Sequence, residues 1–244
     1  MKTKMNMKKI LALFTLATWI PAFAGMTVLL FSIISPAHAA PPTVSPPPLA
    51  EASAPDVTFL TPEEVAKDQK TITRIENYLS GLSTIVSDFT QVAPDGALTS
   101  GKFYLQRPGR MRWQYNPPTP ILMVASGTEL VYYDYELEQV SHIPLDSTLI
   151  GFLAQDKITF DKNVGVVDLS KEAGVIRITM AQRDKPTDGL LMLEFSANPL
   201  TLRNMVVRDA TNQVTTVSLN NARFGLPLDP ELFVFRDPRK GRQR

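Results

Sequence analysis

The chain has 244 residues, 44% hydrophobic and 20% charged, a composition typical of a globular protein with one sizeable core. It contains no cysteine, which excludes a disulfide framework, a thiolate metal site and a cysteine nucleophile. The 25 basic and 24 acidic residues nearly balance, and the basic ones form no stripe. Nucleic acid is therefore not an expected partner.

The first 39 residues have the pattern of an export signal. Four lysines lie within the first nine residues, an apolar stretch runs to about Ile34, and Ala37-His38-Ala39 is an A-x-A cleavage signature. We predict that residues 1–39 are removed, which takes away four lysines and no acid and leaves a net charge of about −3. The alternative is an uncleaved membrane anchor, because about 20 apolar residues can span a bilayer.

The rest of the chain divides into three parts. Residues 40–57 are rich in Pro, Ala and Ser and have no apolar period, which predicts an extended linker. The globular domain is expected to span residues 58–238. A short basic tail, residues 239–244, follows it.

The domain is predicted to open with a helix. Thr61-Pro62-Glu63-Glu64 combines an N-cap threonine, a proline at the first helical position and a capping-box glutamate. Apolar residues then recur at spacings of three and four and form one stripe, which must pack on another apolar surface. The stripe consists of Ile72, Ile75, Leu79 and Leu82.

Nearly everything after the helix is predicted to be strand and turn. Short segments joined by short turns favour antiparallel neighbours, and about ten such strands form one large sheet that curls. A short helix over 147–154 and a turn at 230–232 interrupt them, so the fold class is mainly β, with helices covering the concave face and a hollow between. The expected strands are 84–92, 101–106, 110–115, 121–125, 129–135, 139–143, 164–169, 175–181, 190–195, 202–208, 214–221 and 233–235.

The sequence offers little that points to catalysis. His142 is the one histidine left after removal of residues 1–39, and the acidic residues are scattered among predicted turns. The nucleophile-elbow, phosphate-loop, dinucleotide-binding and zinc-protease motifs are all missing. We therefore expect no catalytic residue, cofactor or metal, although distant carboxylates could still converge in the fold.

One block of residues carries a family resemblance. Gly101–Trp113 reads GKFYLQRPGRMRW, a Pro-containing turn and an apolar strand follow it, and Phe89-Thr90-Gln91 precedes it. This order resembles the LolA family, periplasmic carriers of outer-membrane lipoproteins, from about Thr61 to Pro238. The chain departs from the family pattern at Ser126, where Asp is frequent, and in its long Pro-rich linker and basic tail.

The resemblance implies a half-open β-barrel lidded by helices, with an apolar cavity for lipoprotein acyl chains. Methionines at 111, 123, 180 and 192 support this independently, because Met adapts to variable apolar ligands, although plain core packing is the alternative for each. The residues predicted to line the cavity are Phe103, Leu105, Met111, Trp113, Met123, Ile178, Met180 and Leu193.

The resemblance also implies a latch on the lid. Arg107, just before Pro108, matches the family arginine that donates hydrogen bonds to helix carbonyls and holds the lid closed. A guanidinium suits this role because it has five donors and a fixed charge. The alternative is an ordinary solvent-exposed arginine at the end of a strand.

The implied function is that of a soluble, monomeric periplasmic carrier. It would take lipoproteins from an inner-membrane lipoprotein-releasing transporter to an outer-membrane lipoprotein acceptor. Two alternatives stay open: a lipid- or lipoprotein-sensing module of the same fold, tethered to the inner membrane if its N-terminus is uncleaved, and an enzyme acting on lipid or envelope glycan. A self-lipidated acceptor is excluded because it needs a cysteine.

Overall fold

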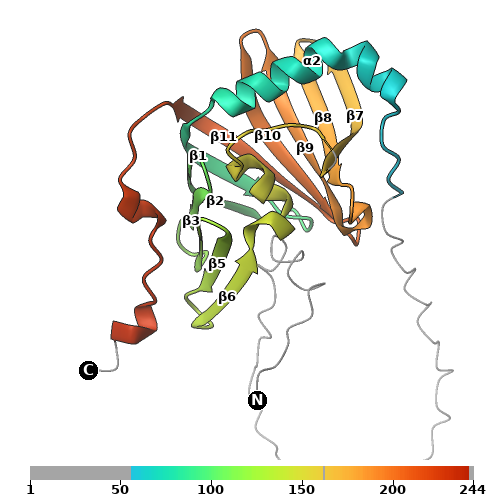
Figure 1. Cartoon of the computed structure of the whole chain (residues 1–244). Helices are drawn as coiled ribbons and strands as arrows, with labels where there is room; N and C mark the ends of the chain where they lie inside the picture. Colours follow the sequence, from blue (N-terminus) through green and yellow to red (C-terminus); the bar gives the residue numbers. More distant parts are fainter. Residues whose placement is uncertain (1–55, 162, 242–244) are drawn as a thin grey trace, which may run out of the picture.

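The structure, a computed structural model, describes residues 56–161 and 163–241. The predicted export signal and most of the predicted linker lie outside the described residues, as does the end of the basic tail. Helix α2 (Pro62–Gly81) lies across one end of a strongly curved sheet, and two short 3-10 helices lie on its concave side (Figure 1).

Helix α2 begins where the sequence predicts. The side chain of Thr61 accepts a hydrogen bond from the backbone N–H of Glu64, and the Glu64 carboxylate accepts one from the backbone N–H of Thr61 at 2.8 Å. Ile72, Ile75 and Leu79 are buried on one face of the helix, which confirms the predicted stripe. Ile75 and Leu79 belong to the apolar cluster on the concave side of the sheet.

The sheet has eleven strands in the order β6-β5-β4-β3-β2-β1-β11-β10-β9-β8-β7, and every neighbouring pair is antiparallel. The first strand pairs with the last, while β6 and β7 form two separate edges, so the curved sheet is a half-open barrel as predicted. The strands are β1 Thr84–Val92, β2 Leu98–Gln106, β3 Arg110–Tyr115, β4 Ile121–Ser126, β5 Glu129–Asp134, β6 Gln139–Pro144, β7 Val164–Glu172, β8 Val175–Gln182, β9 Gly189–Ala197, β10 Leu200–Asp209 and β11 Val214–Phe224.

A crossing segment, residues 145–161, connects the two edges over the concave face, and we call it the strap. It contains two 3-10 helices, η2 (Leu145–Ser147) and η3 (Leu149–Ala154), where the sequence predicts one short helix. The hydroxyl of Thr148 donates to the carbonyl of Leu145 and accepts from the N–H of Gly151, so it divides the two turns. A Cβ at Gly151 would overlap the Leu145 carbonyl, which explains the glycine. A further 3-10 helix, η4 (Pro186–Asp188), lies between β8 and β9.

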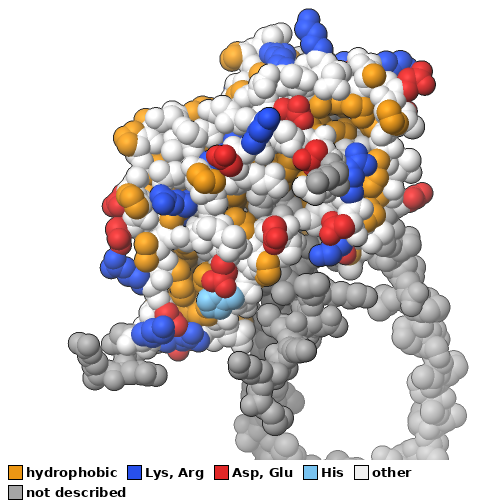
Figure 2. Space-filling view, in the orientation of Figure 1, with side chains coloured by type: hydrophobic (Ala, Val, Ile, Leu, Met, Phe, Trp, Pro, Cys, Tyr) orange, Lys and Arg blue, Asp and Glu red, His pale blue; other side chains and the backbone are white. Residues whose placement is uncertain are grey.

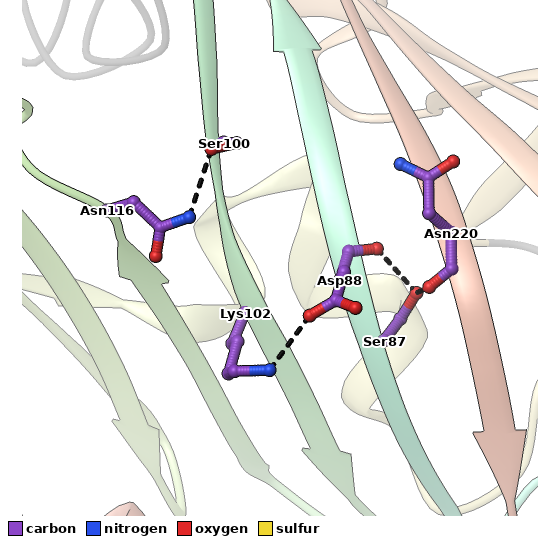
Figure 3. A network of polar contacts seen from close by, with 6 residues as sticks. All are labelled: Ser87, Asp88, Ser100, Lys102, Asn116 and Asn220. Carbon is purple, nitrogen blue, oxygen red and sulfur yellow. Dashed lines mark hydrogen bonds and ion pairs between the residues drawn. The ribbon is translucent and has the colours of Figure 1, made fainter.

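The two faces of the sheet differ in chemistry. Strands such as β1 and β9 alternate buried and more exposed residues, with the buried set facing the strap and α2. The outer face of β11, β1, β2 and β3 is polar: Lys102 pairs with Asp88 at 2.9 Å, and Asn116 donates to Ser100 at 3.0 Å (Figure 3). Acidic and basic side chains are interspersed over the face seen in Figure 2.

The C-terminal segment, residues 226–241, lies against the outer face and corrects one prediction. The expected strand at 233–235 is wrong: η5 (Pro230–Phe233) ends there, and η6 (Pro238–Gly241) follows. Asp229 caps η5 by accepting from the N–H of Glu231, so a helical turn forms. Phe235 packs beside Leu122, Val124 and Tyr133 on the outside of β4 and β5.

Candidate functional site

The structure brings the eight predicted cavity residues into one apolar cluster on the concave side. All are between 0 and 6% exposed. Five come from β2, β3 and β4, and three from β8 and β9, so two wings of the sheet contribute. Cross-strand pairing places Phe103 opposite Trp113, Leu105 opposite Met111, Trp113 opposite Met123 and Ile178 opposite Leu193.

Trp113 lies at the centre of the first wing. Its ring is 4.2 Å from that of Phe103 and 5.0 Å from that of Phe89, centroid to centroid, and its indole N–H donates to the sulfur of Met111 at 3.1 Å. These contacts give a large, polarisable apolar surface on the concave side of β1, β2 and β3.

The interior is closed in this structure, which corrects the expected hollow at these eight residues. Their side chains pack on one another and on the strap residues Ile150, Phe152 and Leu153. A recess of about 20 Å³ under the strap, beside Met180, has room for about one water molecule. Long apolar side chains from the sheet and the strap fill the space between them.

Met192 does not belong to this interior. It occupies an alternate position of β9, between the buried Leu191 and Leu193, and is only partly buried. Because successive side chains of a strand point to opposite faces, it lies on the outer face of the sheet. The prediction that it supports a cavity is therefore wrong.

One end of the interior is polar. The hydroxyl of Tyr115 donates to the side-chain oxygen of Gln91 at 2.7 Å, and both residues are buried. Burial raises the pKa of Tyr115 far above its ordinary value, so the phenol stays a neutral donor. Gln91 is the last residue of the Phe89-Thr90-Gln91 motif, and its contact with Tyr115 was not predicted.

Arg107 follows β2 and points at both parts of the lid. Its Nε donates to the carbonyl of Leu153 in η3 at 2.7 Å, and its Nη1 donates to the carbonyl of Leu79 near the end of α2. In the adjoining turn, the backbone N–H of Gly109 donates to the carbonyl of Ala154 at 2.8 Å. We call these three hydrogen bonds the clasp. Pro108 shapes the turn but is exposed.

The clasp is electrostatically favourable but incompletely satisfied. The guanidinium lies at the C-terminal ends of two helices, where backbone carbonyls accumulate negative potential. Its Nη2 is buried with no hydrogen-bond partner among the described residues. Burial lowers the pKa of Arg107 to about 10, so it remains charged at neutral pH. An unpaired buried donor costs about 1–3 kcal/mol, which weakens the clasp and makes it easier to open.

The two lid parts are also bonded to each other. The backbone N–H of Phe160 donates to the Glu76 carboxylate at 2.8 Å, and the N–H of Ile158 donates to the Ser80 hydroxyl at 3.1 Å. Sequence reasoning missed Glu76 and Ser80. Their spacing of four places them on one helix face beside the apolar stripe, which is the signal that could have identified them.

Other polar groups lie apart from this interior. His142 and Glu129 pair at 3.0 Å on β6 and β5, but both side chains are more than half exposed. Neither residue lines the recess under the strap. Neither lines a second recess of about 180 Å³, whose lining includes Thr90, Leu98 and Asn116. Within residues 56–161 and 163–241, the structure contains no helix that combines the length and hydropathy needed to cross a membrane.

Comparison of this chain with known proteins finds a matching family and several similar proteins. The family model described as "Outer membrane lipoprotein carrier protein LolA" matches residues 80–236. An outer-membrane lipoprotein carrier protein of Methylococcus capsulatus is 31% identical over 173 residues, covering 68% of this chain and 83% of the relative. One from Nitrosomonas europaea is 29% identical over 174 residues, covering 67% and 84% respectively. The crystal structure of a LolA superfamily protein from Nitrosomonas europaea is 13% identical, covers 67% of this chain and 97% of its own, and has a TM-score of 0.40.

Proposed function

Because the chain belongs to the LolA family of outer membrane lipoprotein carriers, we propose that it binds the acyl chains of lipoproteins in the periplasm and carries them between membranes. The observation that supports this most directly is the apolar interior closed by a charged clasp. A few polar bonds hold the cover over this interior, so breaking them is enough to release it.

The energetics of acyl chains favour a cover that opens and closes. Burying a methylene group gains about 0.8 kcal/mol, so a 16-carbon chain gains roughly 12 kcal/mol if fully covered. Several fully covered chains would dissociate too slowly for a carrier. The carrier therefore needs a closed, ligand-free state that competes with the loaded one.

The closed interior supplies this competing state. On release of cargo, the strap residues pack again on the sheet, and Arg107 regains its bonds to the carbonyls of Leu79 and Leu153. Each charge-assisted bond contributes about 1.5–3 kcal/mol. Loading must disrupt these contacts and release restores them, so the net affinity falls into a range from which cargo can be passed on.

The route and partners belong to the proposal. We propose loading from an inner-membrane lipoprotein-releasing transporter and delivery to an outer-membrane lipoprotein acceptor, by a monomer freed from residues 1–39. An inner-membrane-tethered sensing module of the same fold remains the second candidate if the apolar N-terminus is retained.

An enzymatic role has less support. His142 does lie beside an acid, Glu129, which is one feature that would favour an enzyme. An acid–base pair acts on a substrate held in a pocket, whereas this pair lies on two exposed strands outside both recesses.

The protein provides its own probe of binding. The chain has two tryptophans, and Trp19 is removed with the export signal, so Trp113 becomes the only one in the mature protein. A triacylated lipopeptide with brominated chains should quench Trp113 fluorescence in the mature protein. Met111→Glu should weaken quenching far more than it weakens folding, because a carboxylate in an apolar site must be desolvated. Equal loss of binding and of the free energy of unfolding would indicate ordinary core packing instead. Met192→Glu is the matched control and should bind normally. Unquenched fluorescence in the unmodified protein would refute the proposal.

A further inference from the structure

We infer that Glu76 and Ser80 are positioning residues: they fix the strap to α2, so that the two move as one lid unit that a single guanidinium can clasp. This deepens the proposed carrier function and rests on it for its consequence in cargo transfer. The physical claim about the lid unit can be tested without any lipid.

Three interactions join the strap to α2. Phe160 N–H donates to the Glu76 carboxylate at 2.8 Å, and Ile158 N–H donates to the Ser80 hydroxyl at 3.1 Å. The same hydroxyl lies 3.4 Å from the carbonyl of Ile158. Two side chains of α2 thus satisfy the backbone of alternate strap residues, much as a neighbouring strand would. Ile158 is fully buried, and the ring of Phe160 stacks on that of Phe152 in η3 at 5.5 Å.

A different set of bonds holds α2 to the sheet at β9 and β10. Arg74 donates to the carbonyl of Ala197 at 2.7 Å, and the hydroxyl of Tyr78 accepts from the N–H of Leu202 at 3.1 Å. Both partners lie where β9 turns into β10. The lid unit is therefore held to the sheet at two places, the turn between β9 and β10 and the turn between β2 and β3, and at the second place the clasp bonds must break before the lid can move.

The two clasp bonds that Arg107 makes to backbone carbonyls depend on the attachment of the strap to α2. Leu79 and Leu153 are far apart in sequence, yet their carbonyl oxygens both lie within reach of Arg107. If the strap moved independently of α2, Arg107 would often hold only one carbonyl. Glu76 and Ser80 keep η3 and the end of α2 in register, so that closing restores both bonds together.

Hydrogen exchange of single backbone amides tests the unit directly. In Arg107→Leu, the amide of Gly109 should exchange at least roughly tenfold faster, because its bond to Ala154 belongs to the clasp. The amides of Ile158 and Phe160 should keep their protection, because the strap and α2 move together. If these two amides lose protection as much as Gly109 does, the lid does not move as one unit and the inference is wrong. Arg107→Lys serves the same test if the leucine variant folds poorly.

Transfer of a triacylated lipopeptide to acceptor vesicles tests the consequence. Glu76→Ala with Ser80→Ala should slow transfer by roughly tenfold, comparable to the loss of one charge-assisted bond. In a protein that already carries Arg107→Leu, Glu76→Ala with Ser80→Ala should slow transfer little further, because both sets of changes disable the same clasp. Glu76→Gln and Ser80→Thr keep an oxygen at each position and should restore transfer.

Arg74→Ala is the matched control, because it loosens α2 from β9 and β10 rather than from the strap. Its effect should add fully to that of Arg107→Leu. If Glu76→Ala with Ser80→Ala slowed transfer additively with Arg107→Leu, the assignment of Glu76 and Ser80 as positioning residues would be wrong. A failure of the unmodified protein to bind the lipopeptide would instead refute the carrier function and leave the exchange result standing.

Discussion

A single side chain, Arg107, connects three parts of the protein that are distant in sequence. It follows β2, and it binds carbonyls of α2 and of η3. The family resemblance predicts that Arg107, just before Pro108, donates hydrogen bonds to helix carbonyls. It does not predict which carbonyls, because every residue has one. No sequence pattern could have selected Leu79 and Leu153, because only the folded path of α2 and the strap brings them near.

Replacing Arg107 should separate loading from release. Arg107→Leu removes both bonds to the lid and biases it open, so the protein should still bind a lipopeptide. Release should slow by at least roughly tenfold, because closure no longer regains the clasp energy. Arg107→Lys should be intermediate, because an ammonium group lacks the planar fork. The measurement is transfer of a bound lipopeptide to an acceptor, and unchanged transfer by Arg107→Leu would mean that these bonds only stabilise the fold and do not control release.

A buried tyrosine makes a prediction about alkaline stability. Burial, and secondly the charge of Asp134, raise the pKa of Tyr132 to about 12 in the folded protein, against about 10 unfolded. Its contribution is therefore complete below pH 10 and is lost as the pH rises through 12. The free energy of unfolding in urea should fall by up to about 3 kcal/mol from this group over that window. Tyr132→Phe should remove this part of the slope, and an identical slope in both proteins would contradict the assignment.

At the scale of elements, prediction succeeded where local pattern and tertiary environment agree. The capping box at Thr61 and the apolar stripe, whose last member Leu82 is the C-cap, define α2, and the alternation of Met111, Trp113 and Tyr115 defines β3. Prediction failed at 233–235, whose apolar residues resemble a strand. Phe233 is buried and Phe235 is partly buried by packing on the outer face of the sheet, which a local period of two cannot distinguish from strand pairing.

The C-terminal segment should therefore stabilise the sheet through one anchor. Phe233 is 2% exposed, and η5 packs against β3 and β4, where Arg112 donates to the carbonyl of Leu232 at 3.0 Å. Phe233→Ala should lower the free energy of unfolding by about 3 kcal/mol through lost burial and a residual cavity. Its neighbour Val234, 46% exposed, gives the control: Val234→Ala should change it by less than about 0.5 kcal/mol. Equal effects in a denaturant titration would mean that the segment is not anchored by Phe233.

At the scale of the whole molecule, the half-open barrel was predictable and the state of its interior was not. Inward positions such as Met111 and Ile178 are apolar whether they line a cavity or fill a core, so their pattern supports both. The closed state depends on how the strap crosses the sheet, and its sequence predicts only a short helix. The same residues form a packed core in this structure and would form the binding surface in the function that we propose.

The location of the molecule is predicted from residues outside the described part of the chain. Four lysines, an apolar stretch and Ala37-His38-Ala39 predict cleavage after Ala39. The mature protein should begin at Ala40, carry a net charge of about −3 and appear in the soluble periplasmic fraction. Mass spectrometry of the exported protein measures its N-terminus, and Ala39→Leu, which removes the small residue at the cleavage site, is the control that should retain the whole segment. A protein that sediments with membranes and keeps residues 10–34 would be tethered, because a stretch of that length can span a bilayer. That outcome would leave the lid and its clasp intact but would favour the tethered sensing module over a diffusing carrier.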